Sequence, residues 1–271
     1  MGLTYYNRFF WHLAAMSSFK LQNFAHFEGV GTIVHEVSMP STSDVAKSKL
    51  RQNAEIRMPL LVLCDQQTAG RGQRENTWES DHDSLTFTWC ISVDSVPAAN
   101  HPLLPLITGI SVCEAIESIG IANAKLKWPN DVLIDRQKVC GILVEKISSA
   151  GQAWFLIGVG INVNQTAAAM ESLTSSSSSF RPGSLRTFLK SEIQIQSLLE
   201  NVLSRLHENT SAQRDWSQDL DGRFDFLGEQ IKFTKPDGNV VVGFFRGVDE
   251  LGRIKIDVEG ETNLFTSGQL S

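Results

Sequence analysis

Polar and charged residues interrupt a stretch that otherwise has the pattern of buried strands. Residues 127–131 read Lys-Trp-Pro-Asn-Asp and lie between short apolar runs, and Lys138 and Gly141 precede a further run. Short apolar runs bounded by turn residues predict strands. Charged groups between such strands need partners, because burying an unpaired charge is costly. The pattern therefore predicts either a ligand site on a sheet or a surface hairpin with a solvated lysine.

A segment rich in glycine and arginine follows another predicted strand. Residues 67–78 read Gln-Thr-Ala-Gly-Arg-Gly-Gln-Arg-Glu-Asn-Thr-Trp, directly after the apolar run 60–64. Glycines on both sides of Arg71 allow a tight bend that exposes backbone N–H groups. Arg71 and Arg74 are planar donors suited to phosphate or carboxylate. The segment predicts an anion-binding loop, with a solvated turn as the alternative.

A third segment combines a buried strand with glycines and amides. Residues 155–164 read Phe-Leu-Ile-Gly-Val-Gly-Ile-Asn-Val-Asn. The apolar run predicts a strand that ends at Asn162. The Asn162 amide is suited either to the edge of a purine or to capping a turn.

Together, in this order and spacing, these segments resemble the biotin protein ligases. The family pattern is Ser-Thr-Asn, Gln-Thr-Ala-Gly-Arg-Gly-Arg, Lys-Trp-Pro-Asn-Asp, Lys-x-x-Gly-Ile-Leu-x-Glu and Gly-x-Gly-Ile-Asn. The counterparts here are residues 41–43, 67–73, 127–131, 138–145 and 158–162, and the resemblance runs from about residue 36 to the C-terminus.

The chain departs from this pattern at three positions. Ser43 replaces the usual asparagine, Gln73 stands where many members have arginine, and Glu75 stands where glycine is common. Gln73 donates hydrogen bonds without charge, so the charge of the loop is reduced there. Glu75 is expected to pair with Arg71 or Arg74 in the empty enzyme.

The resemblance implies a fold and an activity. The implied fold is α+β, with a mixed-sheet catalytic domain of the biotin/lipoate ligase type and a small C-terminal SH3-like β-barrel. The implied enzyme activates biotin with ATP as biotinyl-5′-AMP and transfers it to a lysine of a biotin carboxyl carrier protein, a part of acetyl-CoA carboxylase or a related carboxylase. Two alternatives stay open: a lipoate ligase or acyltransferase of the same superfamily, and a non-enzymatic regulator that responds to biotinyl-adenylate.

The resemblance also implies roles for single residues. The expected catalytic residues are Lys138 and Arg71. The expected biotin-binding residues are Ser41, Thr42, Gln67, Gly70, Arg71, Lys138 and Gly141. The expected ATP- and adenylate-binding residues are Gly72, Gln73, Arg74, Trp78, Asn130, Asp131 and Asn162. Mg²⁺ is expected to arrive with ATP, and the sequence does not identify its protein ligands.

Charge and cysteine usage narrow the cellular context. The net charge of −6 and the pI of about 5.5 argue against nucleic-acid binding. The four cysteines lie in apolar segments without a Cys-x-x-Cys pair, which predicts buried free thiols in a reducing compartment, the cytoplasm. The six histidines lack metal-ligand spacing and are expected at the surface or as caps. No membrane contact is expected, and a homodimer is left open.

Three regions are expected along the chain. Residues 1–35 are expected to be a poorly ordered extension, too short for the DNA-binding domain of some family members, residues 36–222 the catalytic domain, and residues 223–271 the barrel. The serine-rich stretch 174–179 is expected to be mobile near an adenylate. Expected elements are helices from residue 42 or 43 to 53, at 103–119 and within 185–208, and strands at 85–93, 231–233, 240–245 and 254–258.

Overall fold

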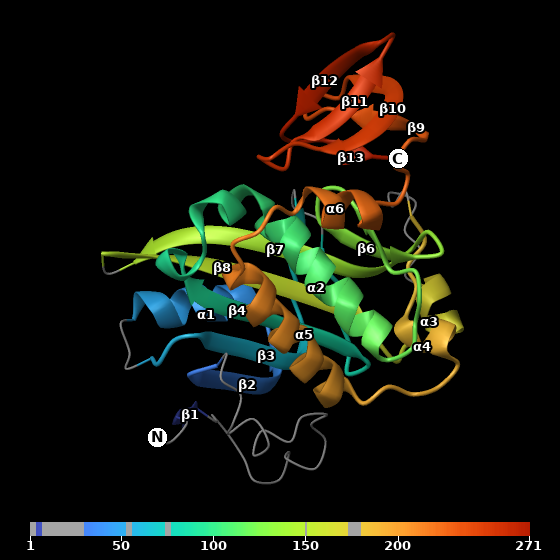
Figure 1. Cartoon of the computed structure of the whole chain (residues 1–271). Helices are drawn as coiled ribbons and strands as arrows, with labels where there is room; N and C mark the ends of the chain where they lie inside the picture. The colour runs from blue at the N-terminus through green and yellow to red at the C-terminus, as the bar shows by residue number, and fades with distance from the viewer. Residues whose placement is uncertain (1–3, 7–29, 53–55, 74–76, 150, 173–179) are drawn as a thin grey trace.

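The chain forms one large mixed sheet with helices on both faces, followed by a smaller antiparallel sheet (Figure 1). The computed structural model describes residues 4–6, 30–52, 56–73, 77–149, 151–172 and 180–271. This architecture confirms the predicted α+β class with a second C-terminal sheet. The expected extension at residues 1–35, the residues Arg74 and Glu75 and the serine-rich stretch lie largely or wholly outside the described residues.

The large sheet has the strand order β1-β2-β3-β4-β8-β7-β6-β5. The β1–β2 and β2–β3 pairs are parallel, and the other neighbours are antiparallel. Its strands are β1 (Thr4–Tyr6), β2 (Thr32–Met39), β3 (Leu60–Gln67), β4 (Ser84–Ser92), β5 (Lys125–Lys127), β6 (Asp131–Ile134), β7 (Gln137–Ser149) and β8 (Gln152–Asn162).

Helices cover the two faces of the large sheet unequally. Helices α2 and α5 lie together on one face, and α1 packs against β3 and β4 on the other (Figure 1). The helices are α1 (Thr42–Arg51), α2 (Leu104–Ser118), α3 (Ala167–Ser172), α4 (Leu185–Leu189), α5 (Ile195–Ser211) and α6 (Ser217–Arg223), with 3₁₀ turns at Val93–Ser95 and Ala98–Leu103.

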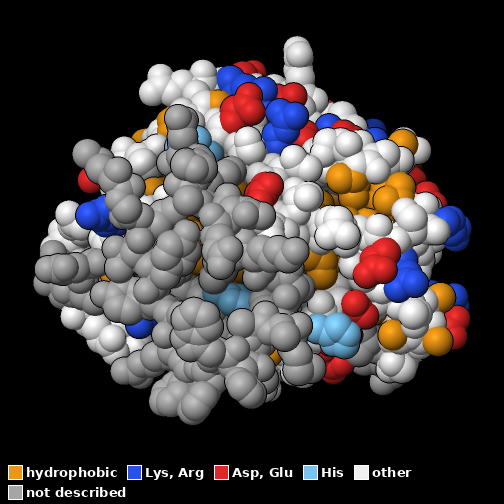
Figure 2. Space-filling view, turned by 90° about the horizontal axis from the view of Figure 1, so that it is seen from below, with side chains coloured by type: hydrophobic (Ala, Val, Ile, Leu, Met, Phe, Trp, Pro, Cys, Tyr) orange, Lys and Arg blue, Asp and Glu red, His pale blue; other side chains and the backbone are white. Residues whose placement is uncertain are grey.

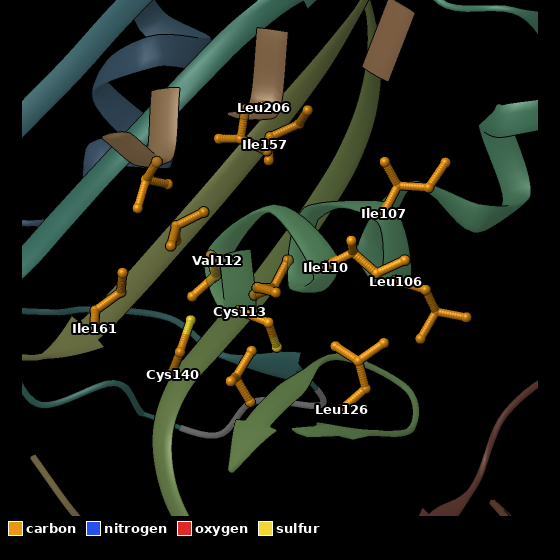
Figure 3. Close-up of a cluster of buried hydrophobic side chains, with 14 of the residues drawn as sticks. Leu106, Ile107, Ile110, Val112, Cys113, Leu126, Cys140, Ile157, Ile161 and Leu206 are labelled. Carbon is orange, nitrogen blue, oxygen red and sulfur yellow. The ribbon is translucent and has the colours of Figure 1, made fainter. Parts of the chain in front are cut away.

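The α2 side holds the main core. Helix α2 is apolar on nearly all sides because it is enclosed by the sheet and by other helices. Figure 3 shows Leu106, Ile110 and Cys113 of α2 beside Leu126 of β5 and Cys140 of β7. Helix α5 buries a single stripe at helical spacing: Leu198, Leu199, Val202, Leu203 and Leu206. The predicted helical region 185–208 is thus confirmed, as the two helices α4 and α5.

Strand β4 shows how the two faces divide. Leu85, Phe87 and Trp89 point into the α2 side, as the alternation in the sequence predicts. Thr86 and Thr88 point to the α1 side and are also buried. Both faces of the strand are therefore covered, and the polar residues line the face that carries the cavity described below.

The predicted helix after residue 41 is confirmed as α1, but its N-cap is Ser41. The side chains of Thr42 and Ser43 bond to Gln67 and Thr88, so they are not available for capping. Thr42 and Ser43, which the sequence predicts as caps, therefore use their hydroxyls in buried contacts with the sheet.

The smaller sheet has the order β12-β11-β10-β9-β13. Its strands are β9 (Gln230–Thr234), β10 (Val240–Val248), β11 (Ile254–Val258), β12 (Glu261–Phe265) and β13 (Gln269–Leu270). The predicted strands at 231–233, 240–245 and 254–258 are confirmed. Phe233 and Phe245 form its interior and are continuous with the main core. The division of the chain at residues 36 and 223 stays a prediction; β2 begins before the first of these positions, and α6 ends at the second.

Two expectations about titratable residues have different outcomes. All four cysteines are buried free thiols, as predicted, and burial raises the pKa of Cys64 and of Cys113 to about 12. The expectation for the histidines is wrong at His35, which is buried and lies 3.0 Å from a carboxylate oxygen of Asp65. The first four residues of β2, which end at His35, are all buried.

The outer surface carries mixed charge where it can be seen from below. Figure 2 shows acidic and basic side chains interspersed on that face, outside the area covered by grey atoms. Among the described residues, no helix is both long enough and apolar enough to cross a membrane.

Candidate active site

One row of paired residues crosses the large sheet on its α1 side. The strand registers align Thr86 of β4, Gly160 of β8, Gly141 of β7, Asp131 of β6 and Lys127 of β5. Paired residues on neighbouring strands point to the same face. The row therefore presents a hydroxyl, two bare backbone positions and a charged pair side by side.

The two glycines form a floor for an aromatic ring. A methyl group added at Gly160 would overlap the Trp78 indole, and one added at Gly141 would lie 3.0 Å from the same ring. The indole therefore lies directly on the backbone of β7 and β8. Its Nε1 is buried without a hydrogen-bond partner. Such a buried donor is costly and marks a place where a polar ligand atom is favoured.

Two lysines share one carboxylate at the end of this row. Asp131 Oδ1 lies 2.6 Å from Lys138 Nζ, and Asp131 Oδ2 lies 3.3 Å from Lys127 Nζ. Burial lowers the pKa of Lys127, and the attraction of Asp131 opposes this effect. The ring of Phe180 covers Lys127, whose Nζ lies 4.4 Å from its centroid. The cluster has one more positive than negative charge, which suits an anionic ligand.

A buried polar network forms the opposite part of the cavity. Thr42 N donates to Gln67 Oε1 at 2.8 Å, and Thr42 Oγ1 donates to the same oxygen at 3.2 Å. Thr88 Oγ1 lies 2.8 Å from Thr42 Oγ1 and 3.1 Å from Ser43 Oγ. Ser41, Thr42, Ser43 and Gln67 all line the cavity. This arrangement suits a neutral polar ring.

The glycine–arginine loop is pinned at its base. The carbonyl of Gly70 accepts a hydrogen bond from Trp78 N at 3.0 Å, and a side chain at residue 70 would collide with the Trp78 backbone. Arg71 lines the cavity and pairs with Asp44 of α1 at 2.7 Å. Gly72 and Gln73 also line the cavity, whereas Arg74 lies outside the described residues. The described part of the loop therefore brings one cation to the cavity wall.

The two asparagines have structural bonds. Asn130 lines the cavity and donates from Nδ2 to the Ile142 carbonyl at 2.5 Å. Asn162 is buried beyond the cavity and donates to the Gly183 carbonyl at 3.0 Å. It thereby holds the segment that follows Phe180 against β7, where Lys138 N donates to the Arg181 carbonyl. A direct role of Asn162 in adenylate binding stays a prediction.

The cavity has a volume of about 690 Å³ and joins all these groups. Of the predicted residues that the structure describes, Gly70 and Asn162 do not line the cavity. The carbonyl of Gly70 instead accepts the hydrogen bond from Trp78 N at the base of the loop. Sequence reasoning missed Phe180, Gly268 and Gln269, which also line it. Gly268 and Gln269 belong to the C-terminal end of the chain, and no local motif marks them. Their position follows from the way the smaller sheet packs on the larger one.

Metal ligands are not concentrated in this site. Within the described ranges, no group of three or more His, Cys, Asp or Glu side chains is arranged to hold a metal ion. Asp131 and Glu79 are carboxylates of the cavity wall, and both oxygens of Asp131 are paired to lysines.

The cavity on this mixed sheet thus combines a neutral polar end with a lysine-rich end. The model of the biotin/lipoate A/B protein ligase family matches residues 35–162, which carry most of the cavity. The chain is similar to biotin protein ligases, which confirms the resemblance inferred from its motifs.

Three relatives illustrate the similarity. The biotin–[acetyl-CoA-carboxylase] ligase of Mycobacterium tuberculosis is 28% identical over 215 residues, 78% of either chain. The bifunctional ligase/repressor BirA of Bacillus subtilis is 35% identical over 138 residues, which are 51% of this chain and 42% of that protein. The biotin protein ligase of Aquifex aeolicus, solved with biotin and ATP, aligns with a TM-score of 0.72 at 27% identity, over 88% of this chain and 97% of that one.

Proposed function

We propose that this protein is an ATP-dependent ligase that converts biotin to biotinyl-5′-AMP and transfers biotin to a lysine of a biotin carboxyl carrier protein. The observation that carries the proposal is the pairing of two ends in one cavity. The Thr42–Gln67 network suits the neutral ureido ring, and the Lys127–Asp131–Lys138 cluster suits carboxylate and phosphate. Thr88 of β4, which belongs to the network, and Asp131 of β6 lie three strand spacings apart, roughly 14 Å, which suits a ring with an extended acyl arm.

The first chemical step forms a mixed anhydride. A carboxylate oxygen of biotin attacks the α-phosphorus of ATP, a new P–O bond forms, and pyrophosphate leaves with the electron pair of the broken bond. Negative charge increases on the α-phosphate in the transition state. An ammonium group has three N–H donors, and the Lys138 pair with Asp131 uses one, so Lys138 can stabilise that charge. Arg71 and the backbone of Gly72 are proposed to hold the reacting groups from the loop side.

The second step transfers the acyl group. The neutral amine of a carrier lysine attacks the anhydride carbonyl, AMP leaves, and the amine nitrogen loses one proton as the amide forms. No covalent bond to the enzyme is needed, so positioning and charge neutralisation carry the catalysis. Phe180 and Gln269 line the cavity and are proposed to limit the access of water to the adenylate.

We propose that Mg²⁺ enters with ATP. Phosphate oxygens and water supply most ligands of Mg²⁺ in such sites, with one or two protein carboxylates. Both oxygens of Asp131 already pair with lysines, so Glu79 is the carboxylate on the cavity wall that fits this limited role. Bound Mg²⁺ would supply further neutralisation of phosphate charge.

The cytoplasm is proposed as the compartment, because ATP is a substrate and the four thiols are buried and unpaired. The proposed partner is a carrier domain with a target lysine. A homodimer stays a prediction.

The proposal is tested by pyrophosphate release from ATP in the presence of biotin or lipoate. Biotin should stimulate release, and lipoate should not, because the hydroxyl and amide groups of the ring-binding end have no partners on an apolar dithiolane. A carrier domain should then gain one biotin on its target lysine by mass spectrometry, and its Lys→Arg variant should gain none. Stimulation by lipoate alone would support the lipoate ligase. Tight adenylate binding without transfer would support a regulator.

A further inference from the structure

Four charged side chains form a network beside the cavity, apart from the lysine cluster. Arg71 Nη2 lies 2.7 Å from Asp44 Oδ2, and Lys47 Nζ lies 3.9 Å from Asp44 Oδ1. Lys47 Nζ also donates to Glu145 Oε1 of β7 at 2.7 Å. Of the four residues, only Arg71 lines the cavity. The network therefore joins a cationic residue of the cavity wall to a charged contact between α1 and β7.

The carboxylate of Asp44 lies between two cations at unequal distances. Its Oδ2 forms a short pair with Arg71, whereas its Oδ1 faces Lys47 from beyond hydrogen-bond distance. An ammonium group has three N–H donors, and Glu145 accepts from one of those of Lys47. A movement of about 1 Å would bring Lys47 within hydrogen-bond distance of Oδ1. Lys47 can therefore become the partner of Asp44 when Arg71 moves away.

Burial determines which of the two cations moves. The side chain of Lys47 is 15% exposed, whereas that of Arg71 is 58% exposed. The pair with Glu145 holds Lys47 in place, while an exposed guanidinium exchanges its partner at low cost. Glu145 Oε2 is buried without a hydrogen-bond partner in the part of the chain that the structure describes. Asp44, Lys47 and Glu145 together carry one more negative than positive charge, so they attract Arg71 in the empty enzyme.

Asp44 opposes the binding of an anion at Arg71. A negative ligand group is attracted by Arg71 and repelled by Asp44, so the neutral pair offers it little net attraction. When Lys47 closes on Asp44, the carboxylate gains a new partner. The positive charge of Arg71 is then available to the ligand.

We infer that Asp44 and Lys47 are positioning residues for Arg71: Asp44 holds the guanidinium in the empty enzyme, and Lys47 releases it by taking over Asp44. The inference rests on the proposed function, in which Arg71 holds the reacting carboxylate or phosphate. Neither residue of α1 lines the cavity. The two residues therefore change the affinity for the charge of the ligand and leave the affinity for its neutral parts unchanged.

The test measures charge selectivity with two stable analogues of the adenylate. In the first, a phosphodiester with one negative charge joins adenosine to the alcohol that corresponds to biotin. In the second, that phosphodiester is methylated to a neutral triester. Dissociation constants are measured by titration calorimetry, and the charge selectivity is the constant of the triester divided by that of the diester. Asp44→Asn should raise the selectivity about two- to five-fold, the range of one exposed ion pair.

Lys47→Met tests the exchange of partners. In the wild-type background it should lower the selectivity about two- to five-fold, because Asp44 then keeps Arg71. In the Asp44→Asn background it should leave the selectivity unchanged, because no carboxylate needs a new partner. Lys49→Met is the matched control, since it removes the same charge from the same helix, and its effect should be the same in both backgrounds.

Two further variants separate charge from stability. Lys47→Arg keeps the cation and should keep the wild-type selectivity. Lys47→Met combined with Glu145→Gln leaves no carboxylate unpaired between α1 and β7, and it should show the same selectivity as Lys47→Met alone. The double variant carries the test if the single variant does not fold.

The outcomes are distinct. A lower selectivity in Asp44→Asn would show that Asp44 orients Arg71 toward the ligand, and an equal effect of Lys47→Met in both backgrounds would show a general effect of charge. Either result, or an unchanged selectivity in both single variants, would overturn the inference while biotin-dependent pyrophosphate release remains. Absence of biotin binding by the wild-type protein would overturn the proposed function and this inference with it.

Discussion

At the scale of single residues, the cations of the cavity wall are paired with carboxylates. Asp131 holds both Lys127 and Lys138, and Asp44 holds Arg71. The pairs differ in burial: Arg71 is 58% exposed, whereas Lys127 is 7% exposed. Exposed pairs contribute little to stability, so Arg71 can exchange its partner for a ligand at low cost. Lys127, by contrast, is buried between Asp131 and the ring of Phe180 and cannot exchange its partner in this way.

Lys138→Ala is expected to slow adenylation by roughly 10²–10³-fold, as is typical for the loss of one donor that stabilises transition-state charge. The fold should persist, because Asp131 keeps Lys127 as a partner. Pyrophosphate release in a single turnover measures the effect. Lys146→Ala is the matched control, since Lys146 is an exposed lysine of the same strand outside the cavity. Equal rates in the two variants would remove Lys138 from the proposed role.

Lys127 is expected to make stability depend on alkaline pH. Burial lowers its pKa in the folded state below the ordinary 10.5, so between the two values the unfolded chain binds more protons. The free energy of unfolding of the wild type, relative to Lys127→Met, should therefore rise with pH through that window and be level below it. Urea unfolding of both proteins from pH 7 to pH 10.5 measures the difference. A fall over the alkaline range would contradict the direction of the shift.

At the scale of elements, the register of β4, β8 and β7 determines the floor of the cavity. Gly160 and Gly141 are opposite each other only because the β7–β8 pairing has this register. A slip by one residue would turn Val159 or Ile161 toward the cavity and the glycines toward the core. The hairpin is therefore as important to the site as the motif residues themselves.

Gly160→Ala is expected to displace the Trp78 indole, because the added methyl group overlaps it. The value of kcat/KM for biotin should fall by at least about ten-fold, since a displaced ring either blocks or uncovers the ligand site. Gly222→Ala serves as the control, because a methyl group there meets nothing within 4 Å. Steady-state kinetics and thermal unfolding distinguish a local from a global effect. Wild-type kinetics in Gly160→Ala would show that the glycine floor is not part of the ligand site.

At the scale of the whole molecule, residues 224–271, which include the smaller sheet, reach the cavity by two routes. Gly268 and Gln269 line the cavity directly. Phe226 contacts Phe180 with ring centroids 5.6 Å apart, and Phe180 covers Lys127. Arg136, in the turn between β6 and β7, lies over Phe226 and pairs with Glu229 at 2.6 Å. Trp128 Nε1 adds a bond to the Gly252 carbonyl. These contacts couple the C-terminal sheet to the lysine cluster.

Phe226→Leu should reduce adenylation about three- to ten-fold and lower the free energy of unfolding by about 1 kcal/mol, the scale of one aromatic pair. The reason is that Phe180 loses the ring that supports it over Lys127. Phe244→Leu is the control, because Phe244 is an exposed phenylalanine of β10 in the smaller sheet that does not line the cavity. Adenylation rates and urea unfolding are measured for both. Equal, small effects of the two variants would indicate that the smaller sheet acts on stability alone.

The amino-acid sequence by itself predicted many of the strands, the main helices and part of the cavity wall. The spacing of apolar residues along a strand or helix indicates which side chains are buried. The buried face of β4 and the buried stripe of α5 can therefore be predicted from the local sequence. The block Lys127–Asp131 and Lys138 are recognisable because charged groups are rare between buried strands. Their pairing through Asp131 follows from short connections between neighbouring strands.

Only the tertiary structure decided which distant groups meet. The row from Thr86 to Lys127 depends on the register of five strands, and register is a property of pairing that no single segment encodes. The hydrogen bond between the hydroxyls of Ser43 and Thr88 joins α1 to β4, and Gln269 comes from the far end of the chain. Such contacts arise when separate apolar faces pack together, and this packing brings polar residues with no shared local pattern into one cavity.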